Sequence, residues 1–165
     1  MSSTSSYSIT FADALTKLNW GTASWHTAGQ AAQTRLDLLA ARREVTGFQI
    51  HLTAPHDFVL VVDRANWLHP LGFRSRVRLD VRFPGLPADA IEVFPVGYVE
   101  GDDRRLWAET LDRRAYAEVP AGRTQPVYVR LRVPADVEPG LYAGQVRAFA
   151  QQAFDDESLL WEGQV

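Results

Sequence analysis

The sequence predicts an all-β fold, a two-sheet antiparallel β-sandwich of about eight or nine strands. Three observations favour it: period-two alternation of apolar and polar residues recurs along the chain, Gly, Pro and Asp turns interrupt it often, and no long segment has a helical period. The chain has 165 residues, of which 46% are hydrophobic, so one domain can bury its own core. A barrel would also accommodate such strands, and we favour the sandwich.

The N-terminal region differs from the rest. Residues 1–10 are rich in Ser and Thr and lack an apolar period, which predicts a mobile tail. The spacing of Phe11, Leu15 and Leu18 then predicts a short helix or turn. We expect residues 11–165 to form a single sandwich domain.

Two strand predictions are especially clear. Residues 74–83 place Val77, Leu79 and Val81 on one face and arginines on the other, and Phe58–Val62 is a continuous apolar run typical of a buried strand. Residues 127–133 and 142–150 are predicted to pair as an antiparallel hairpin around a turn at 134–140. The remaining predicted strands are 35–40, 48–53, 91–99 and 159–165.

Composition excludes several classes of protein. The absence of cysteine rules out disulfides and zinc–thiolate sites. The net charge is −3, and the 17 basic residues are scattered rather than clustered, which argues against nucleic-acid binding. No window approaches the roughly 18 apolar residues of a membrane span, and the polar N-terminus shows no signal peptide, so the sequence predicts a cytoplasmic protein without a membrane partner.

No catalytic motif is visible. The sequence lacks G-x-S-x-G, HExxH and a phosphate-binding glycine loop. The four histidines show no close ligand spacing, although His51 and His56 flank one predicted turn and could approach each other. The acidic clusters Asp102-Asp103 and Asp155–Glu157 are expected in solvated turns. We therefore predict no catalytic residue, no metal and no cofactor in this chain.

Three aromatic residues near predicted turns or strand ends form the first candidate site. Rings exposed there could stack on the apolar faces of sugars, as in a carbohydrate-binding module. The alternative is that such rings close the ends of the sandwich or pack on a neighbouring domain. The residues are Trp67, Tyr98 and Trp107.

A row of arginines forms the second candidate site. Guanidinium groups on one strand face, extended by Arg130 and Arg132 of another strand, could bind an anionic glycan. The alternative is a solvated face whose charge is balanced by acidic residues on neighbouring strands. The row consists of Arg74, Arg76, Arg78 and Arg82.

Two segments resemble a known family. Residues 126–146, PVYVRLRVPADVEPGLYAGQV, resemble the VP-x-D-x-x-P-G-x-Y-x-G-x-V strand pair of β-sandwich domains that precede the catalytic barrel in glycoside hydrolase family 123 and its uncharacterised bacterial relatives. Residues 40–50, AARREVTGFQI, are similar to an early strand pair of the same domains. In that hairpin Gly144 would leave room for a neighbouring side chain.

The resemblance implies an accessory domain. The family's hydrolytic residues lie in the following barrel, so none can be assigned here. The alternation still running at Val165 is what we expect of the N-terminal part of a longer protein, and the resemblance implies that this full-length protein is a glycoside hydrolase. Our first hypothesis is a non-catalytic sandwich that supports or docks onto a downstream catalytic domain of the same polypeptide. The second is a carbohydrate-binding module with a glycan partner. The third is a small stand-alone hydrolase or isomerase with His51 or Asp37 facing an interior cavity.

Overall fold

The computed structural model describes residues 7–18, 20, 34–62, 75–153 and 156–165. Within these ranges the chain forms ten strands, and no helix there is long and apolar enough to cross a membrane. The predicted all-β sandwich is confirmed, with slightly more strands than expected. The strands are β1 (Ser8–Asp13), β2 (Val45–Thr53), β3 (Phe58–Val61), β4 (Arg76–Arg82), β5 (Ile91–Glu100), β6 (Leu106–Leu111), β7 (Tyr116–Val119), β8 (Thr124–Arg132), β9 (Gln145–Ala153) and β10 (Asp156–Gln164).

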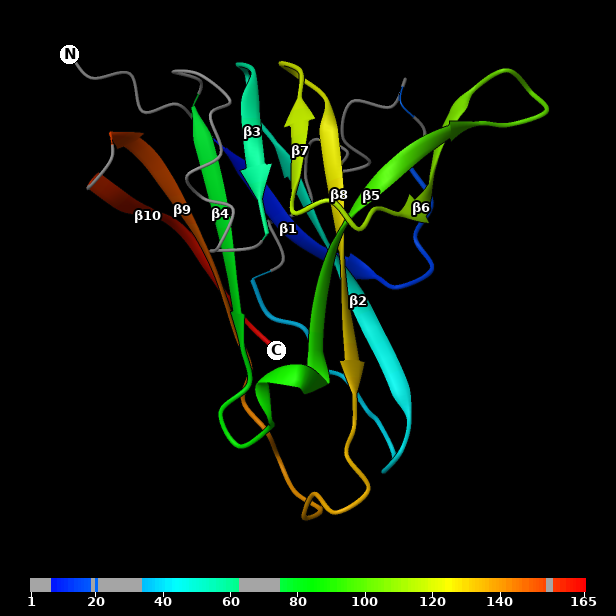
Figure 1. Cartoon of the computed structure of the whole chain (residues 1–165), viewed down its shortest axis with the longest axis vertical. Helices are drawn as coiled ribbons and strands as arrows, with labels where there is room; N and C mark the ends of the chain where they lie inside the picture. The colour runs from blue at the N-terminus through cyan, green and yellow to red at the C-terminus, as the bar shows by residue number, and fades with distance from the viewer. Residues whose placement is uncertain (1–6, 19, 21–33, 63–74, 154–155) are drawn as a thin grey trace.

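The strands form two layers (Figure 1). The first sheet has the order β1-β2-β8-β5-β6, and the second has the order β10-β9-β4-β3-β7. Neighbouring strands are antiparallel except β3 and β4, which are parallel. Most neighbours are distant in sequence, so side chains from separate parts of the chain meet on each face of a sheet.

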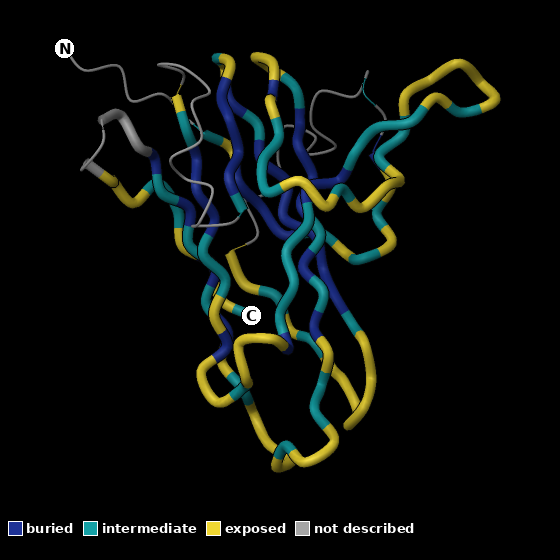
Figure 2. The backbone as a smooth tube through the Cα atoms, in the orientation of Figure 1, coloured by how far each residue is buried: buried dark blue, intermediate teal, exposed yellow. Residues whose placement is uncertain are grey.

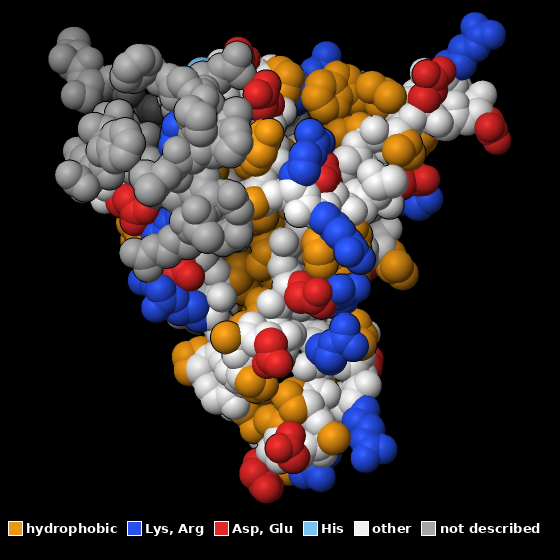
Figure 3. Space-filling model, viewed as in Figure 1, with side chains coloured by type: hydrophobic (Ala, Val, Ile, Leu, Met, Phe, Trp, Pro, Cys, Tyr) orange, Lys and Arg blue, Asp and Glu red, His pale blue; other side chains and the backbone are white. Residues whose placement is uncertain are grey.

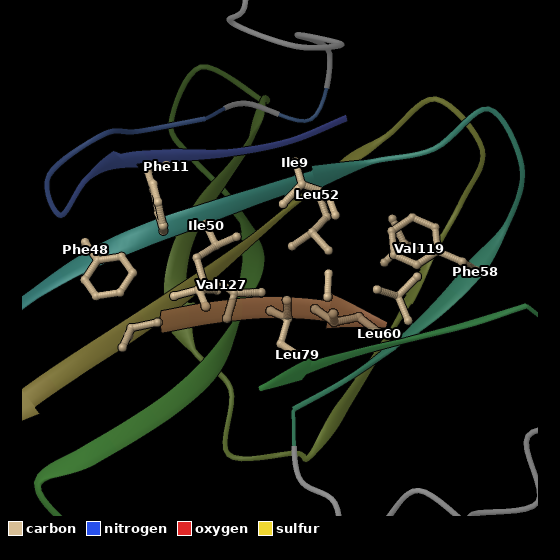
Figure 4. Close-up of a cluster of buried hydrophobic side chains, with 14 of the residues drawn as sticks. Ile9, Phe11, Phe48, Ile50, Leu52, Phe58, Leu60, Leu79, Val119 and Val127 are labelled. Carbon is tan, nitrogen blue, oxygen red and sulfur yellow. The ribbon is translucent and has the colours of Figure 1, made fainter. Parts of the chain in front are cut away.

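The core lies between the inner faces of the sheets. On β2, Phe48 pairs with Val129 and Ile50 pairs with Val127 of β8, and all four side chains are fully buried. Figure 4 shows these inner residues facing those of the second sheet, and Figure 2 shows the buried backbone concentrated in the middle of the molecule. Burying each Phe, Leu, Ile or Val contributes about 1.5–3 kcal/mol, which makes this layer the main source of stability. The second sheet supplies Phe58, Leu60, Val77, Leu79, Val146 and Ala148.

The N-terminal prediction is wrong for residues 11–13 and right for the residues that follow. Ser8–Asp13 is a strand that pairs with β2, and a turn comes after it at residues 14–15, where the Thr16 amide donates to the Asp13 carbonyl at 3.1 Å. Ile9 and Phe11 are both buried, which is the period-two pattern of a strand. The predicted tail therefore extends too far, because residues 8–10 belong to the first sheet; residues 1–6 lie outside the described ranges.

The predicted hairpin is also wrong. β8 lies in the first sheet and β9 in the second, so residues 133–144 cross from one layer to the other instead of turning back within a sheet. Alternation shows that each segment is a strand, but it does not say which strand is its partner. The predicted strand at 35–40 is absent too, since only an isolated bridge joins Arg35 to Gln164.

Candidate functional site

The aromatic candidates do not share one face. Trp67 lies outside the described residues. On the β5–β6 hairpin, Tyr98 pairs with Ala108, whereas Trp107 pairs with Val99. Because adjacent residues of a strand point to opposite faces, Tyr98 and Trp107 lie on opposite sides of the hairpin. The structure does not bring these two rings into one plane.

Tyr98 is packed under neighbouring residues. Its hydroxyl donates to the Thr124 carbonyl at 2.6 Å, and its ring meets Trp20 edge to face at 4.8 Å between centroids. Arg123 lies over the other ring, 5.3 Å from the Trp20 centroid, and donates to the Trp20 carbonyl. Burial raises the pKa of Tyr98 to about 12, although the Arg123 charge partly opposes that shift. Both the ring and the hydroxyl of Tyr98 therefore already make contacts within the protein.

Trp107 has a different environment, near the turn of the hairpin. Its indole N–H donates to Oδ1 of Asp103 at 3.1 Å, and this hydrogen bond, with that from the Arg105 amide, lowers the pKa of the Asp103 carboxyl. The side chain is partly exposed. Its polar atom nonetheless already has a partner across the turn, so Trp107 stabilises the protruding hairpin.

The arginine row is partly buried and paired. Arg74 lies outside the described residues, while β4 places Arg76, Arg78 and Arg82 on its outer face. Arg78 donates through Nε and Nη2 to the two carboxylate oxygens of Glu157, at 3.0 and 2.8 Å, and its guanidinium lies 4.6 Å from the Phe149 ring centroid. Only 7% of Arg78 is exposed. The prediction of a solvated turn at Glu157 is wrong, because this residue lies in β10 and neutralises Arg78.

Asp80 balances the next part of this face. It lies between Arg82 and Arg147, whose nitrogens approach its Oδ2 within 2.9 Å. Burial alone would raise the pKa of Asp80, but hydrogen bonds from the two guanidinium groups outweigh that effect and lower it. We call Arg78, Glu157, Asp80, Arg82 and Arg147 the paired charge face.

Arg130 and Arg132 do not extend this face. They lie on β8 in the first sheet, on the opposite side of the sandwich, so the expectation that they adjoin the β4 arginines is wrong. Both are near Glu92, with the closer Arg130 contact at 2.7 Å. Opposite charges on adjacent strands therefore neutralise each other locally on both outer faces.

Histidines and carboxylates do not assemble a centre in the described ranges. No group of three or more there is placed to hold a metal ion. His51 alternates with core residues of β2, so it points away from the sandwich interior, and its Nε2 lies 3.0 Å from Oε1 of Gln49. His56 instead contacts the Tyr7 hydroxyl at 2.9 Å. Asp37 is exposed and pairs with Arg35, so neither His51 nor Asp37 lines an interior cavity.

A cleft of about 510 Å³ opens where the β8–β9 connection crosses between the sheets. Its walls are the loop 37–42 and residues 137–142, and Val165 also lines it. Figure 3 shows hydrophobic side chains gathered at this tapered end of the molecule, with charged groups around them. The apolar lining consists of Leu38, Leu39, Ala40, Ala41, Phe83, Leu86, Leu131, Val133, Val137, Pro139, Leu141 and Val165.

Backbone hydrogen bonds fix the walls of this apolar cleft. The 35–44 loop is held to the end of β8 by bonds from the Arg43 amide to Val133 and from the Val133 amide to Glu44, at 3.0 and 2.8 Å. Val165 and Gly144 exchange two further bonds, at 3.0 and 2.6 Å. Because both walls are attached at their base, the cleft is built into the fold.

Gly144 lets the backbone pass close to Phe83, a residue that lines the cleft. A Cβ added at this position would overlap the Phe83 ring, so only glycine lets the backbone pass so close to it. The prediction that Gly144 leaves room for a neighbouring side chain is therefore confirmed, and that side chain is Phe83. Across the connection, the Tyr142 hydroxyl donates to the Glu138 carbonyl at 2.7 Å and steadies the wall.

Sequence reasoning missed the cleft. Two of its large apolar residues, Leu39 and Leu141, are 96% and 98% exposed. A signal did exist, because Leu38-Leu39 breaks strict alternation and Leu141 directly follows Pro139-Gly140, where a turn is expected to be polar. Large apolar side chains in turns deserve the same scrutiny as aromatic ones.

The sequence comparisons find no relative, whereas the structural comparison finds a shared fold. No family model matches the sequence, and no curated protein matches it either. A solved structure of a family 123 glycoside hydrolase from Clostridium perfringens superposes with a TM-score of 0.68 at 8% sequence identity. The match covers 96% of this chain and 26% of that one. The fold is thus shared with part of a glycoside hydrolase chain, and this chain spans about a quarter of its length.

Proposed function

We propose that this sandwich is a non-catalytic accessory domain of a bacterial, glycoside-hydrolase-like protein, and that it docks onto a catalytic domain further along the same polypeptide. The observation that supports this proposal most is the unequal coverage, nearly all of this chain against about a quarter of a glycoside hydrolase. In such an arrangement the sandwich supplies an interface, and the chemistry occurs elsewhere.

The geometry of the described surface agrees with a docking role. The arginines of the paired charge face already contact carboxylates, which weakens the attraction of this face for an anionic partner. The apolar cleft, in contrast, leaves large leucines in contact with water. Exposed apolar patches of this kind are typical of sites that contact another protein surface.

A carbohydrate-binding module is the alternative, and it has less support. Tyr98 is covered by Trp20, and Trp107 lies on the other face of the hairpin. A flat platform for sugar rings would need at least two coplanar, accessible aromatic rings.

The first test is to sequence the coding region beyond codon 165 and to assay two proteins, the 165-residue chain and the polypeptide that the reading frame encodes. We expect a downstream catalytic domain, with hydrolysis of aryl glycosides by the longer protein and none by the short chain. A reading frame that stops at codon 165 would overturn the proposal. Retardation of the short chain in polysaccharide gels would favour the carbohydrate-binding module instead.

A further inference from the structure

The apolar cleft combines two exposed anchors with a fixed floor. Leu39 and Leu141 stand almost fully in water on its two walls, while Phe83 and Leu131 below them are buried in the sandwich. The walls are held by backbone hydrogen bonds, so little ordering is needed before a partner binds. Such a surface suits an apolar segment that inserts between two leucines.

The polar side chains that line the cleft are fewer than the apolar ones: Asp37, Arg42, Thr46, Glu138 and Tyr142. Asp37 is already paired with Arg35, and the Tyr142 hydroxyl donates to the Glu138 carbonyl. Arg42 and Glu138 add charges of both signs. A mainly apolar lining with a few polar groups is typical of a protein–protein interface, whereas a sugar or small polar ligand needs several convergent hydrogen-bonding groups.

The position of Val165 indicates which protein surface would meet the cleft. This residue lines the cleft and is held to Gly144 by two backbone hydrogen bonds. Residues that follow Val165 in a longer polypeptide would therefore start at the cleft, and each could carry the chain at most about 3.5 Å away. A domain tethered so closely has an effective concentration of about millimolar or more, which makes even a modest apolar contact sufficient for docking.

From these observations we infer that the apolar cleft is the docking site for the domain that follows in the same polypeptide, and that it receives an apolar loop or helix end of that domain between Leu39 and Leu141. This inference rests on the proposed function and adds the surface and the chemistry of the contact. The paired charge face and the β5–β6 hairpin stay outside the interface.

Hydrogen–deuterium exchange of the longer polypeptide, compared with the 165-residue chain, tests this assignment. We expect amides in segments 36–42 and 134–142 to exchange about ten-fold more slowly in the longer protein, with no change in the hairpin turn 101–105. Leu141→Asp should remove most of that protection, because a carboxylate would enter the apolar contact. Leu15→Asp is the matched control, since Leu15 is 87% exposed and does not line the cleft.

The other outcomes separate the two proposals. Protection confined to another surface would overturn the cleft assignment and leave the docking function standing, as would protection that survives Leu141→Asp. Absence of protection anywhere would overturn both, as would a reading frame that ends at codon 165. Slower exchange of the cleft segments in the short chain at rising concentration would identify a second copy as the occupant, and it too would overturn the assignment.

Discussion

The paired charge face and the apolar cleft are both formed by residues from distant parts of the chain, but they differ in whether their side chains are covered within the domain. On the charge face, Arg78 and Asp80 of β4 meet partners from β9 and β10, so their charges are neutralised within the domain. In the cleft, Leu39 and Leu141 have no comparable cover and remain exposed. The difference teaches that a conspicuous charge pattern can be internally complete, while an inconspicuous pair of leucines marks the surface that is left open.

The largest effect on stability is expected at Gly144, where the backbone packs against the Phe83 ring. Gly144→Ala should destabilise the protein by about 2–3 kcal/mol, because the new methyl group would overlap the buried Phe83 ring. Urea unfolding measures the loss. Gly140→Ala is the matched control in the same connection, since a Cβ there has no neighbour within 4 Å. Equal stabilities of the two variants would contradict the close approach.

The second largest effect on stability is expected on the paired charge face. Glu157→Ala is expected to cost about 2 kcal/mol, because it leaves the nearly buried Arg78 guanidinium without its two carboxylate contacts. Glu162→Ala, an exposed position on the same strand, should change stability by less than about 0.5 kcal/mol. If both substitutions had the same small effect, the face would be an ordinary solvated surface.

A pH titration sharpens the comparison further. The pKa of Asp80 is lowered in the folded protein from its usual 3.8, so its stabilisation is present above about pH 4 and is lost as pH falls through the lower folded pKa. Asp80→Asn should therefore cost about 1 kcal/mol at neutral pH and progressively less as the pH falls below about 4. Urea midpoints of both proteins, measured from neutral to acid pH, give the difference in stability. A difference that did not shrink with falling pH would point to packing rather than charge.

The smallest effect on stability is expected at the rim of the cleft. Leu141→Asp should change the free energy of unfolding by less than about 0.5 kcal/mol, because the side chain is exposed. The Leu141→Asp protein should nevertheless bind less of an apolar fluorescent dye than the wild-type protein does. The Leu15→Asp protein should bind as much dye as the wild type. Equal dye fluorescence in all three proteins would show that the cleft does not bind apolar groups.

Sequence reasoning succeeded where one face of a strand is buried and the other is polar. The alternation around β4 placed Val77 and Leu79 in the core, and the apolar run at β3 is buried throughout. It missed β6 (Leu106–Leu111), whose residues are exposed or only partly buried, and β7 (Tyr116–Val119), which has four residues. Such strands are formed by pairing with neighbours more than by an apolar pattern of their own.

For the same reason, the sequence did not predict which strands pair with one another. Alternation in β8 and β9 is equally clear, yet the strands lie in different sheets. The polar side of β2 is covered as well, because Gln49 and His51, on the face opposite Phe48 and Ile50, are buried. Gln49 donates to the carbonyls of Ala14 and Thr16, a contact that only the folded chain reveals.

The pairing of β2 with β8 also determines how late in translation the first sheet can form. Residues 45–53 leave the ribosome long before residues 124–132, the strand that covers one whole edge of β2. At about 5–20 residues per second, the nascent chain must keep Phe48, Ile50 and Leu52 exposed for several seconds. Slow codons before residue 124 or depletion of chaperones should therefore increase aggregation of newly made protein, even though the completed sandwich buries residues 47–52 of this strand.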